Sequence, residues 1–271
     1  MKNVTRTEEV NNTLSNSEIH SKWIGDYFSK ENQEFYRIVF EYLKRRFQIP
    51  NDAHILDVGC GSGNHSITLA NIGFRVTGID YSKYILEIAE KNITNAGLKN
   101  RISLLHGDIL SLIGISDFDY VLCWGVLMHI PEYEIALNEL IRILNPGGLL
   151  IISEVNMNSL QSRLHRILNK LRNKKQSIYI NDYGVEQWWD SPSGKIIVRA
   201  ANIDWLRKYF AKKNVFLIKR ISGQLTELYT VVSNKYFLKV IYNLNTFWFK
   251  HIRIPNLAFG NILVFRKAIN D

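Results

Sequence analysis

Residues 54–66 read HILDVGCGSGNHS, a short apolar run followed by glycines at three alternate positions, Gly59, Gly61 and Gly63. A buried strand that leads through such a loop into a helix is the usual ligand-binding crossing of a doubly wound parallel sheet. Glycine lets the backbone turn tightly there and approach a ligand closely. The dinucleotide fingerprint G-x-G-x-x-G requires a glycine where this chain has Asn64. The spacing therefore predicts a cofactor loop that departs from the dinucleotide type.

Segments with the character of strands and helices alternate around this loop. Short, mostly apolar segments predict seven strands, at 54–59, 75–80, 101–108, 118–125, 149–155, 215–222 and 260–268. Helical periodicity separates them, at 64–73, 81–97, 132–144 and 202–214. Apolar strands alternating with helices are typical of a parallel sheet that is covered on both faces. The sequence thus predicts an α/β, doubly wound, Rossmann-like seven-stranded sheet with helices on both faces.

Additional segments surround this core. Residues 19–47 predict one or two N-terminal helices, and residues 160–175 predict a basic amphipathic helix. A tryptophan-bearing loop is expected before residue 202, and residues 236–252 predict an aromatic helix inserted before the last strand. We divide the chain into four segments: an N-terminal helical cap (1–47), a cofactor-binding core (48–155), a substrate-lid insert (156–200), and a C-terminal segment (201–271) that completes the sheet and carries an aromatic, basic insert. We expect the helices of 19–47 and the insert after the fifth strand to form the substrate pocket.

Charge is distributed unevenly over the 271 residues. Residues 1–160 carry a net charge of −5 and residues 161–271 a net charge of +14, which gives +9 for the chain. The basic second half predicts either an anionic partner or a solvated basic face. The polar N-terminus resembles no secretory signal, and no apolar run approaches the length of about 20 residues that a membrane helix needs. Two cysteines are too few for a disulfide framework, so we expect a cytoplasmic protein.

Five motifs in one order point to a family. DVGCGSG (57–63) is followed by GIDYS (78–82), HGDIL (106–110), FDYVLCWGVLMHI (118–130) and LNPGGLLIISE (144–154). Together they resemble the class I S-adenosylmethionine-dependent methyltransferases, whose first motif is an acidic residue followed by x-G-x-G-x-G. The resemblance is close over residues 54–154 and looser outside them. It implies S-adenosylmethionine as the cofactor, and no metal site is expected.

The resemblance also implies roles for individual residues. The loop from Asp57 to Gly63 would hold the methionine part of the cofactor, and Asp80 would accept hydrogen bonds from the ribose hydroxyls. Asp108 would contact the adenine amino group. The other expected cofactor-binding residues are Tyr81, Ile109, which would lie beside the adenine ring, and Trp124, for which packing is the alternative.

His129 is the candidate catalytic residue. It follows the fourth expected strand on the side where the acceptor should bind, and a histidine near its ordinary pKa can take a proton from a hydroxyl group. A structural role is the alternative. The sequence therefore predicts methyl transfer to an oxygen or nitrogen of a small-molecule or lipid-linked acceptor.

Three other functions stay open at this stage. The basic second half fits an RNA methyltransferase, but CWGVLMHI (123–130) replaces the N/D-P-P-aromatic motif of nucleobase amine methylation and argues against a nucleic acid acceptor. An NAD(P)-dependent enzyme would also use an acidic residue at Asp80. A non-catalytic S-adenosylmethionine-binding protein would bind the cofactor without turnover.

The basic helix at 160–175 also allows more than one partner. Its leucine face and its Lys/Arg face fit a peripheral contact with the anionic inner surface of the cell membrane. The alternatives are that it is a solvated lid helix or that it contacts phosphate groups. No feature of the sequence specifies an oligomeric state.

Overall fold

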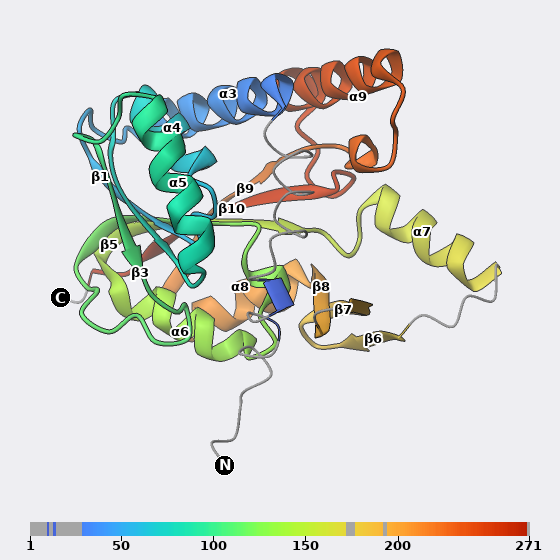
Figure 1. Cartoon of the computed structure of the whole chain (residues 1–271). Coiled ribbons are helices and arrows are strands. Elements are labelled where there is room, and N and C mark those ends of the chain that lie inside the picture. Colours follow the sequence, from blue (N-terminus) through green and yellow to red (C-terminus); the bar gives the residue numbers. More distant parts are fainter. Residues whose placement is uncertain (1–9, 11–12, 15–28, 172–176, 192–193, 270–271) are drawn as a thin grey trace.

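One mixed sheet organises the chain. The computed structural model describes residues 10, 13–14, 29–171, 177–191 and 194–269. The strands of the large sheet are β1 (His54–Val58), β2 (Arg75–Asp80), β3 (Ile102–His106), β4 (Phe118–Trp124), β5 (Leu144–Val155), β9 (Val215–Ser222) and β10 (Gly260–Lys267). They lie in the order β3-β2-β1-β4-β5-β10-β9 (Figure 1). Strand β10 is antiparallel to β5 and β9, and the other pairs are parallel. The predicted seven-stranded, doubly wound core is confirmed.

Helices cover both faces of this sheet. On one face lie α3 (Lys30–Arg46), α4 (Asn64–Asn71) and α5 (Lys83–Asn95), and on the other lie α6 (Tyr133–Ile143) and α8 (Ile203–Ala211). Alternate residues of a strand point to opposite faces, so each central strand serves both layers. In β4, for example, Val121 and Cys123 join the buried cluster of α6 and α8, while Leu122 joins that of α3 and α4. This double burial explains why the strands read as nearly continuous apolar runs.

The order of the strands locates the ligand-binding edge. The chain runs from β1 outward to β3, and then crosses back to β4 on the other side of β1. Such a reversal leaves a crevice at the carboxyl ends of the two central strands. The glycine loop, which follows β1, lies at this reversal.

The tryptophan-bearing segment before residue 202 forms strands, so its prediction as a loop was wrong. Strands β6 (Ser177–Asn181), β7 (Gly184–Ser191) and β8 (Gly194–Ala201) make a separate antiparallel sheet. The amide oxygen of Asn181 accepts hydrogen bonds from the backbone N–H groups of Tyr183 and Gly184, which closes the first turn. These strands mix polar and apolar residues: β8 buries Ile197, Arg199 and Ala201, whereas β6 exposes Tyr179 and Ile180.

The remaining helices lie at the periphery. Helix α7 (Leu160–Leu171) begins where the basic amphipathic helix was predicted, and residues 172–176 lie outside the described residues. Helix α9 (Lys235–Phe247) continues into the π-helical turn η3 (Trp248–Ile252), which confirms the predicted aromatic helix. Of the predicted N-terminal helices, α3 is described and 19–28 lie outside the described residues.

The N-terminal end of α3 contacts α9, and the two helices follow one another along the top of Figure 1. The hydroxyl oxygens of Ser29 and Tyr242 are 3.3 Å apart, and the rings of Phe35 and Phe249 lie edge to face at 5.7 Å. The N-terminal helix is thereby joined to the C-terminal insert. The division of the chain into four functional segments stays a prediction.

Candidate active site

A cavity of about 450 Å³ opens at the carboxyl ends of β1, β2, β4 and β5. Most of the residues that the sequence assigned to cofactor or catalysis line it. They are Gly59, Gly61, Asp80, Tyr81, Asp108, Ile109, Trp124 and His129. Asp57 and Gly63 do not line it. The specific contacts that the sequence assigned to each of these residues stay predictions.

The two glycines of the loop that line the cavity meet different surroundings. Gly59 has a φ of +72°, and a Cβ there would lie 2.3 Å from Cγ2 of Val126. Gly61 has a φ of +54°, but a Cβ there would have no protein atom within 4 Å. Gly59 is therefore required by protein packing, whereas the open side of Gly61 leaves room for a ligand beside the backbone.

Asp80 fastens this loop to the end of β2. Its Oδ2 accepts a hydrogen bond from the Gly61 N–H at 2.9 Å, and its Oδ1 accepts one from the Ser82 N–H at 2.9 Å. Burial raises the pKa of Asp80, and these backbone donors oppose the rise. A carboxylate has about four acceptor sites, so Asp80 can accept further hydrogen bonds from a ligand in the cavity.

Asp57 lies beneath the loop. It is 1% exposed, and its Oδ2 accepts a hydrogen bond from the Ser66 hydroxyl at 2.6 Å. Burial raises the pKa of Asp57 to about 6, and the Ser66 bond opposes the rise. This bond ties β1 to the helix that follows the loop, so Asp57 orients the loop from below.

The loop after β3 contributes the next part of the wall. Asp108 Oδ1 accepts a hydrogen bond from the Leu110 N–H at 2.9 Å, which holds the turn. Ile109 is buried and presents an apolar surface to the cavity. Tyr81 follows Asp80, and its ring lies 6.4 Å from that of His106. An acidic and an apolar group thus lie together on this side, as a purine ring with an exocyclic amine would require.

An aromatic wall closes another side. The Trp124 ring lies 5.3 Å from Phe40, 5.8 Å from Tyr36 and 5.4 Å from His65, so Trp124 packs against α3 as well as lining the cavity. Burial lowers the pKa of His65 to about 4. Its Nε2 is buried without a hydrogen-bond partner in the described part of the chain. Sequence reasoning missed His65, although it follows the glycine loop directly.

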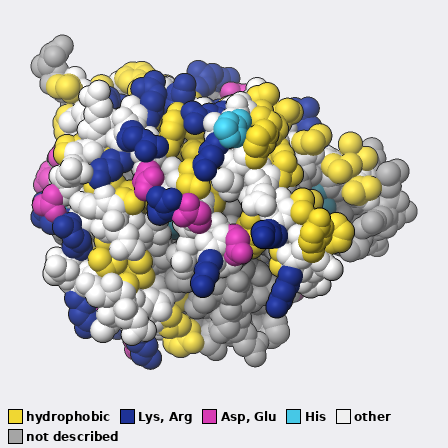
Figure 2. All heavy atoms as spheres, turned by 90° about the horizontal axis from the view of Figure 1, so that it is seen from above, with side chains coloured by type: hydrophobic (Ala, Val, Ile, Leu, Met, Phe, Trp, Pro, Cys, Tyr) yellow, Lys and Arg dark blue, Asp and Glu magenta, His cyan; other side chains and the backbone are white. Residues whose placement is uncertain are grey.

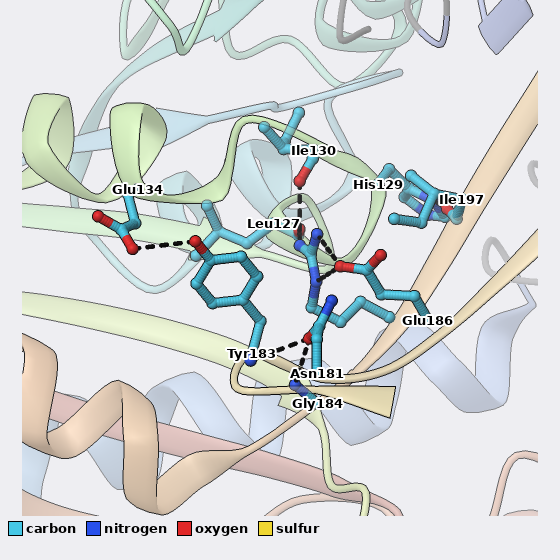
Figure 3. Close-up of polar contacts among 10 residues, drawn as sticks. Leu127, His129, Ile130, Glu134, Asn181, Tyr183, Gly184, Glu186 and Ile197 are labelled. Carbon is cyan, nitrogen blue, oxygen red and sulfur yellow. Dashed lines mark hydrogen bonds and ion pairs between the residues drawn. The ribbon is translucent and has the colours of Figure 1, made fainter. Parts of the chain in front are cut away.

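His129 lies on η1 (Leu127–His129), the short turn after β4, and its imidazole is held by the insert sheet (Figure 3). The ring Nδ1 is 2.8 Å from the carbonyl oxygen of Ile197. A carbonyl only accepts, so Nδ1 carries the proton and Nε2 keeps the basic lone pair. Burial lowers the pKa of His129, the bond to Ile197 opposes this, and the charge of Arg199 adds to it. The ring is therefore neutral near pH 7.

Arg199 binds the backbone of the same turn at Leu127 and Ile130, both labelled in Figure 3. It is fully buried, and it donates to the backbone carbonyls of Leu127 at 3.1 Å and Ile130 at 3.0 Å. Its Nε and Nη2 donate to Glu186 Oε1 at 3.0 and 2.8 Å. The guanidinium also lies 4.3 Å from the ring centroid of Tyr133. Strand β8 thereby holds the turn that carries His129, an arrangement the sequence reasoning did not include.

Glu154, on β5, is a buried acidic residue that lines the cavity and that the sequence reasoning missed. A carboxylate within the apolar strand LLIISEV was the available signal. Burial raises the pKa of Glu154 to about 8, against the opposing charge of Arg199.

In the described part of the chain no group of three or more His, Cys, Asp or Glu side chains is arranged to hold a metal ion. Among the described helices, none is both long and apolar enough to cross a membrane.

The profile of the methyltransferase domain family matches residues 49–230. The demethylmenaquinone methyltransferase of Staphylococcus haemolyticus is 30% identical over 160 residues, which are 57% of this chain and 64% of that protein. The chain thus spans less than two thirds of the length of this curated relative.

Solved structures share the fold at low identity. Magnesium protoporphyrin IX methyltransferase from Synechocystis PCC 6803, solved with bound S-adenosylhomocysteine, has a TM-score of 0.62 at 17% identity, with 95% of this chain and 98% of that chain covered. The CcbJ methyltransferase from Streptomyces caelestis has a TM-score of 0.62 at 13% identity, with 97% and 100% covered. The chain belongs to the class I S-adenosylmethionine-dependent methyltransferase domain family.

Proposed function

We propose that this enzyme methylates an oxygen or nitrogen of a hydrophobic, lipid-linked acceptor at the surface of an anionic membrane. The observation that carries the proposal is that one cavity reaches from the glycine loop to His129 and on to Gln224 and Glu227, beside an exposed apolar and basic surface. The acceptor would enter from that surface and meet the cofactor at the carboxyl edge of the sheet.

The residues at the glycine loop fit S-adenosylmethionine. Gly61 leaves open space beside its backbone, Asp80 has unused acceptor capacity for ribose hydroxyls, and Asp108 with Ile109 offers an acceptor and an apolar contact for adenine. The cofactor supplies a methyl group on a positively charged sulfur. Holding the acceptor atom close to that methyl group accounts for much of the catalysis that the protein must provide.

His129 would take the proton that a hydroxyl acceptor loses. The bond from Nδ1 to Ile197 selects the tautomer in which Nε2 is the basic nitrogen, and the lowered pKa keeps the ring neutral near pH 7. Since the lowered pKa also makes the ring a weaker base, positioning of the acceptor would contribute more than proton transfer.

The surface beside the cavity supports a lipid-linked acceptor. Helices α7 and α9 expose large apolar side chains, with Lys and Arg around them, and Figure 2 shows such patches on the side where α9 lies in Figure 1. The exposed apolar residues are Leu160, Leu164, Ile167 and Leu168 on α7, and Tyr236, Phe237, Val240, Leu244 and Phe247 on α9. Apolar side chains mixed with basic ones are typical of helices that lie on anionic membranes.

Hydrogen bonds connect this surface to the cavity. The side-chain oxygen of Gln161, on α7, accepts hydrogen bonds from the Thr226 hydroxyl at 2.6 Å and from the Glu227 N–H at 3.1 Å. Asn245, on α9, accepts from the Thr226 N–H at 3.1 Å. Glu227 lines the cavity and is the only acidic residue between positions 223 and 260.

The relative named demethylmenaquinone methyltransferase acts, by its name, on a quinone, which agrees with a hydrophobic acceptor. A cytoplasmic enzyme at the inner face of the membrane would meet such acceptors.

Co-sedimentation with vesicles tests the membrane part of this proposal. We expect the protein to bind phosphatidylglycerol-containing vesicles at low salt, to bind pure phosphatidylcholine vesicles at least tenfold more weakly, and to be released by salt. Phe237→Glu should weaken binding, whereas Ile113→Glu, at a residue that is 87% exposed and far from α7 and α9 in the sequence, should not. Equal binding of both variants, or no binding to anionic vesicles at low salt, would refute membrane docking.

Methyl transfer from labelled S-adenosylmethionine tests the chemistry. Transfer to an organic-extractable acceptor in a lipid extract, lost after Asp80→Ala, would support the proposal. Transfer only to RNA or to a water-soluble fraction would contradict it.

A further inference from the structure

Glu154 presents an unpartnered carboxyl group to the cavity. It is 2% exposed, and neither of its carboxylate oxygens has a hydrogen-bond partner among the described residues. A buried polar group without a partner is costly, and such groups are rare in folded proteins. Because Glu154 lines the cavity between Ser153 and Val155, at the carboxyl end of β5, a bound ligand can supply the missing partner.

The surroundings of Glu154 determine which ligand group fits. Arg199 interacts electrostatically with Glu154, but its guanidinium is engaged by Glu186 and by two backbone carbonyls. Burial raises the pKa of Tyr133, whose hydroxyl has no partner within the described residues, and that of Cys123, and Glu154 lies near enough to both to act on them electrostatically. No described side chain therefore satisfies Glu154, although an arginine is near.

The protonation state of Glu154 further restricts which chemical group of a ligand can pair with it. With its pKa raised to about 8 by burial, Glu154 carries a proton at pH 7, so it both donates and accepts a hydrogen bond. A neutral hydroxyl group does the same and can pair with it in both directions. An ammonium group would need an ionised carboxylate, and it would add a third positive charge to those of Arg199 and the sulfonium of the cofactor.

We propose that Glu154 binds a neutral hydroxyl group on the methyl acceptor, and so selects hydroxyl-bearing ring compounds over ring compounds without one. The buried side chains of Arg199 and Tyr133 interact electrostatically with Glu154 and so lie near this binding group. The inference rests on the proposed methyl transfer, since it assigns a partner for the acceptor in the same cavity. It narrows the acceptor to an alcohol, enol or phenol.

A matched pair of probes tests this inference. 2-Naphthol and 2-methoxynaphthalene share one ring system, but only the first has a hydroxyl proton to donate. Each is titrated into the wild-type protein saturated with S-adenosylhomocysteine. We expect 2-naphthol to bind about fivefold or more tightly than its methyl ether, as one net hydrogen bond in a buried site would give.

Three variants identify Glu154 as the source of the preference. Glu154→Leu should remove it, whereas Glu154→Gln, which keeps a donor and an acceptor, should retain most of it. Glu90→Gln, on the exposed surface of α5, is the control and should behave as wild type. Glu154→Leu should fold, because it replaces an unsatisfied buried polar group by an apolar one of similar size.

The outcomes separate this inference from the proposed function. If 2-naphthol fails to bind, or if the preference is absent from the wild type or unchanged in Glu154→Leu, the inference is wrong even though S-adenosylhomocysteine binds. If S-adenosylhomocysteine itself does not bind the folded wild type, the proposed function fails first.

Discussion

Replacement of Arg199 by methionine is expected to destabilise the protein strongly. Arg199 is fully buried and joins β8 to Glu186 and to the carbonyls of Leu127 and Ile130. Breaking a buried ion pair by removing one partner costs about 3–5 kcal/mol, because it leaves the other charge uncompensated. The Glu186 side chain is 12% exposed, so water relieves little of that cost.

The two carbonyls add a smaller contribution. Each would lose a charge-assisted hydrogen bond, and an unsatisfied buried carbonyl costs about 1–3 kcal/mol unless the turn shifts toward water. Since these losses overlap, we expect Arg199→Met to lower the free energy of unfolding by about 3–5 kcal/mol in total. Movement of the turn would also displace His129, so methyl transfer should fall more than cofactor binding.

Urea unfolding of a short variant series measures this effect. Replacing both partners, in Arg199→Met with Glu186→Leu, should recover part of the loss, because no lone charge then stays buried. Arg207→Met, at an exposed arginine on α8, is the control and should change stability by less than about 0.5 kcal/mol. A loss below about 1 kcal/mol for Arg199→Met, or a double variant less stable than the single one, would refute the reasoning.

Further predictions concern the glycine loop and the buried titratable groups. Gly59→Ala should destabilise the fold through its clash with Val126, whereas Gly61→Ala should fold with a loss of about 1 kcal/mol and bind S-adenosylhomocysteine more weakly; equal thermal stability of the two variants would contradict this. Burial lowers the pKa of His65 to about 4 from 6.5, so His65 contributes stability above pH 6.5 that is lost as pH falls towards 4. In His65→Phe the free energy of unfolding should therefore depend less on pH between 6.5 and 4. Burial raises the pKa of Glu154 to about 8 from 4.5, so Glu154 contributes stability below pH 4.5 that is lost as pH rises towards 8. If the stability of the wild type changes with pH as little as that of Glu154→Gln over this range, the raised pKa is contradicted.

The core could be predicted because its signals are local. Strands buried on both faces read as apolar runs, and glycines mark the turns that end them. The loop from Gly59 onward could be assigned for the same reason, since Asp80 and Asp108 follow the next two strands and the carboxyl ends of parallel strands meet at one edge.

The insert sheet and its contacts could not be predicted in the same way. Strands β6 and β7 expose large apolar side chains such as Tyr179, Ile180 and Trp189, and one buried position of β8 is a charged residue, Arg199, so hydrophobic periodicity did not distinguish them from a loop. The carbonyl partners of Arg199 lie 69 and 72 positions away in the sequence, and Ile197 lies 68 positions from His129. Such pairings depend on how the insert sheet packs against the turn after β4, which a single sequence does not encode locally.

Asp57 illustrates an intermediate case. Its position before the first glycine identified it as part of the loop, but the sequence did not reveal which way the side chain faces. The structure directs it to Ser66 beneath the loop, where its carboxylate is 1% exposed and lies outside the lining of the cavity.

S-adenosylmethionine should bind in the cavity through the glycine loop and Asp80. Calorimetric titration of S-adenosylhomocysteine into the wild type, Asp80→Ala and the exposed-site control Asp190→Ala measures this binding. We expect micromolar binding to the wild type and the control, a loss of about 30-fold or more in Asp80→Ala from two missing ribose hydrogen bonds, and no binding of NAD. Absence of binding to the folded wild type, unchanged affinity in Asp80→Ala, or tighter binding of NAD would contradict it.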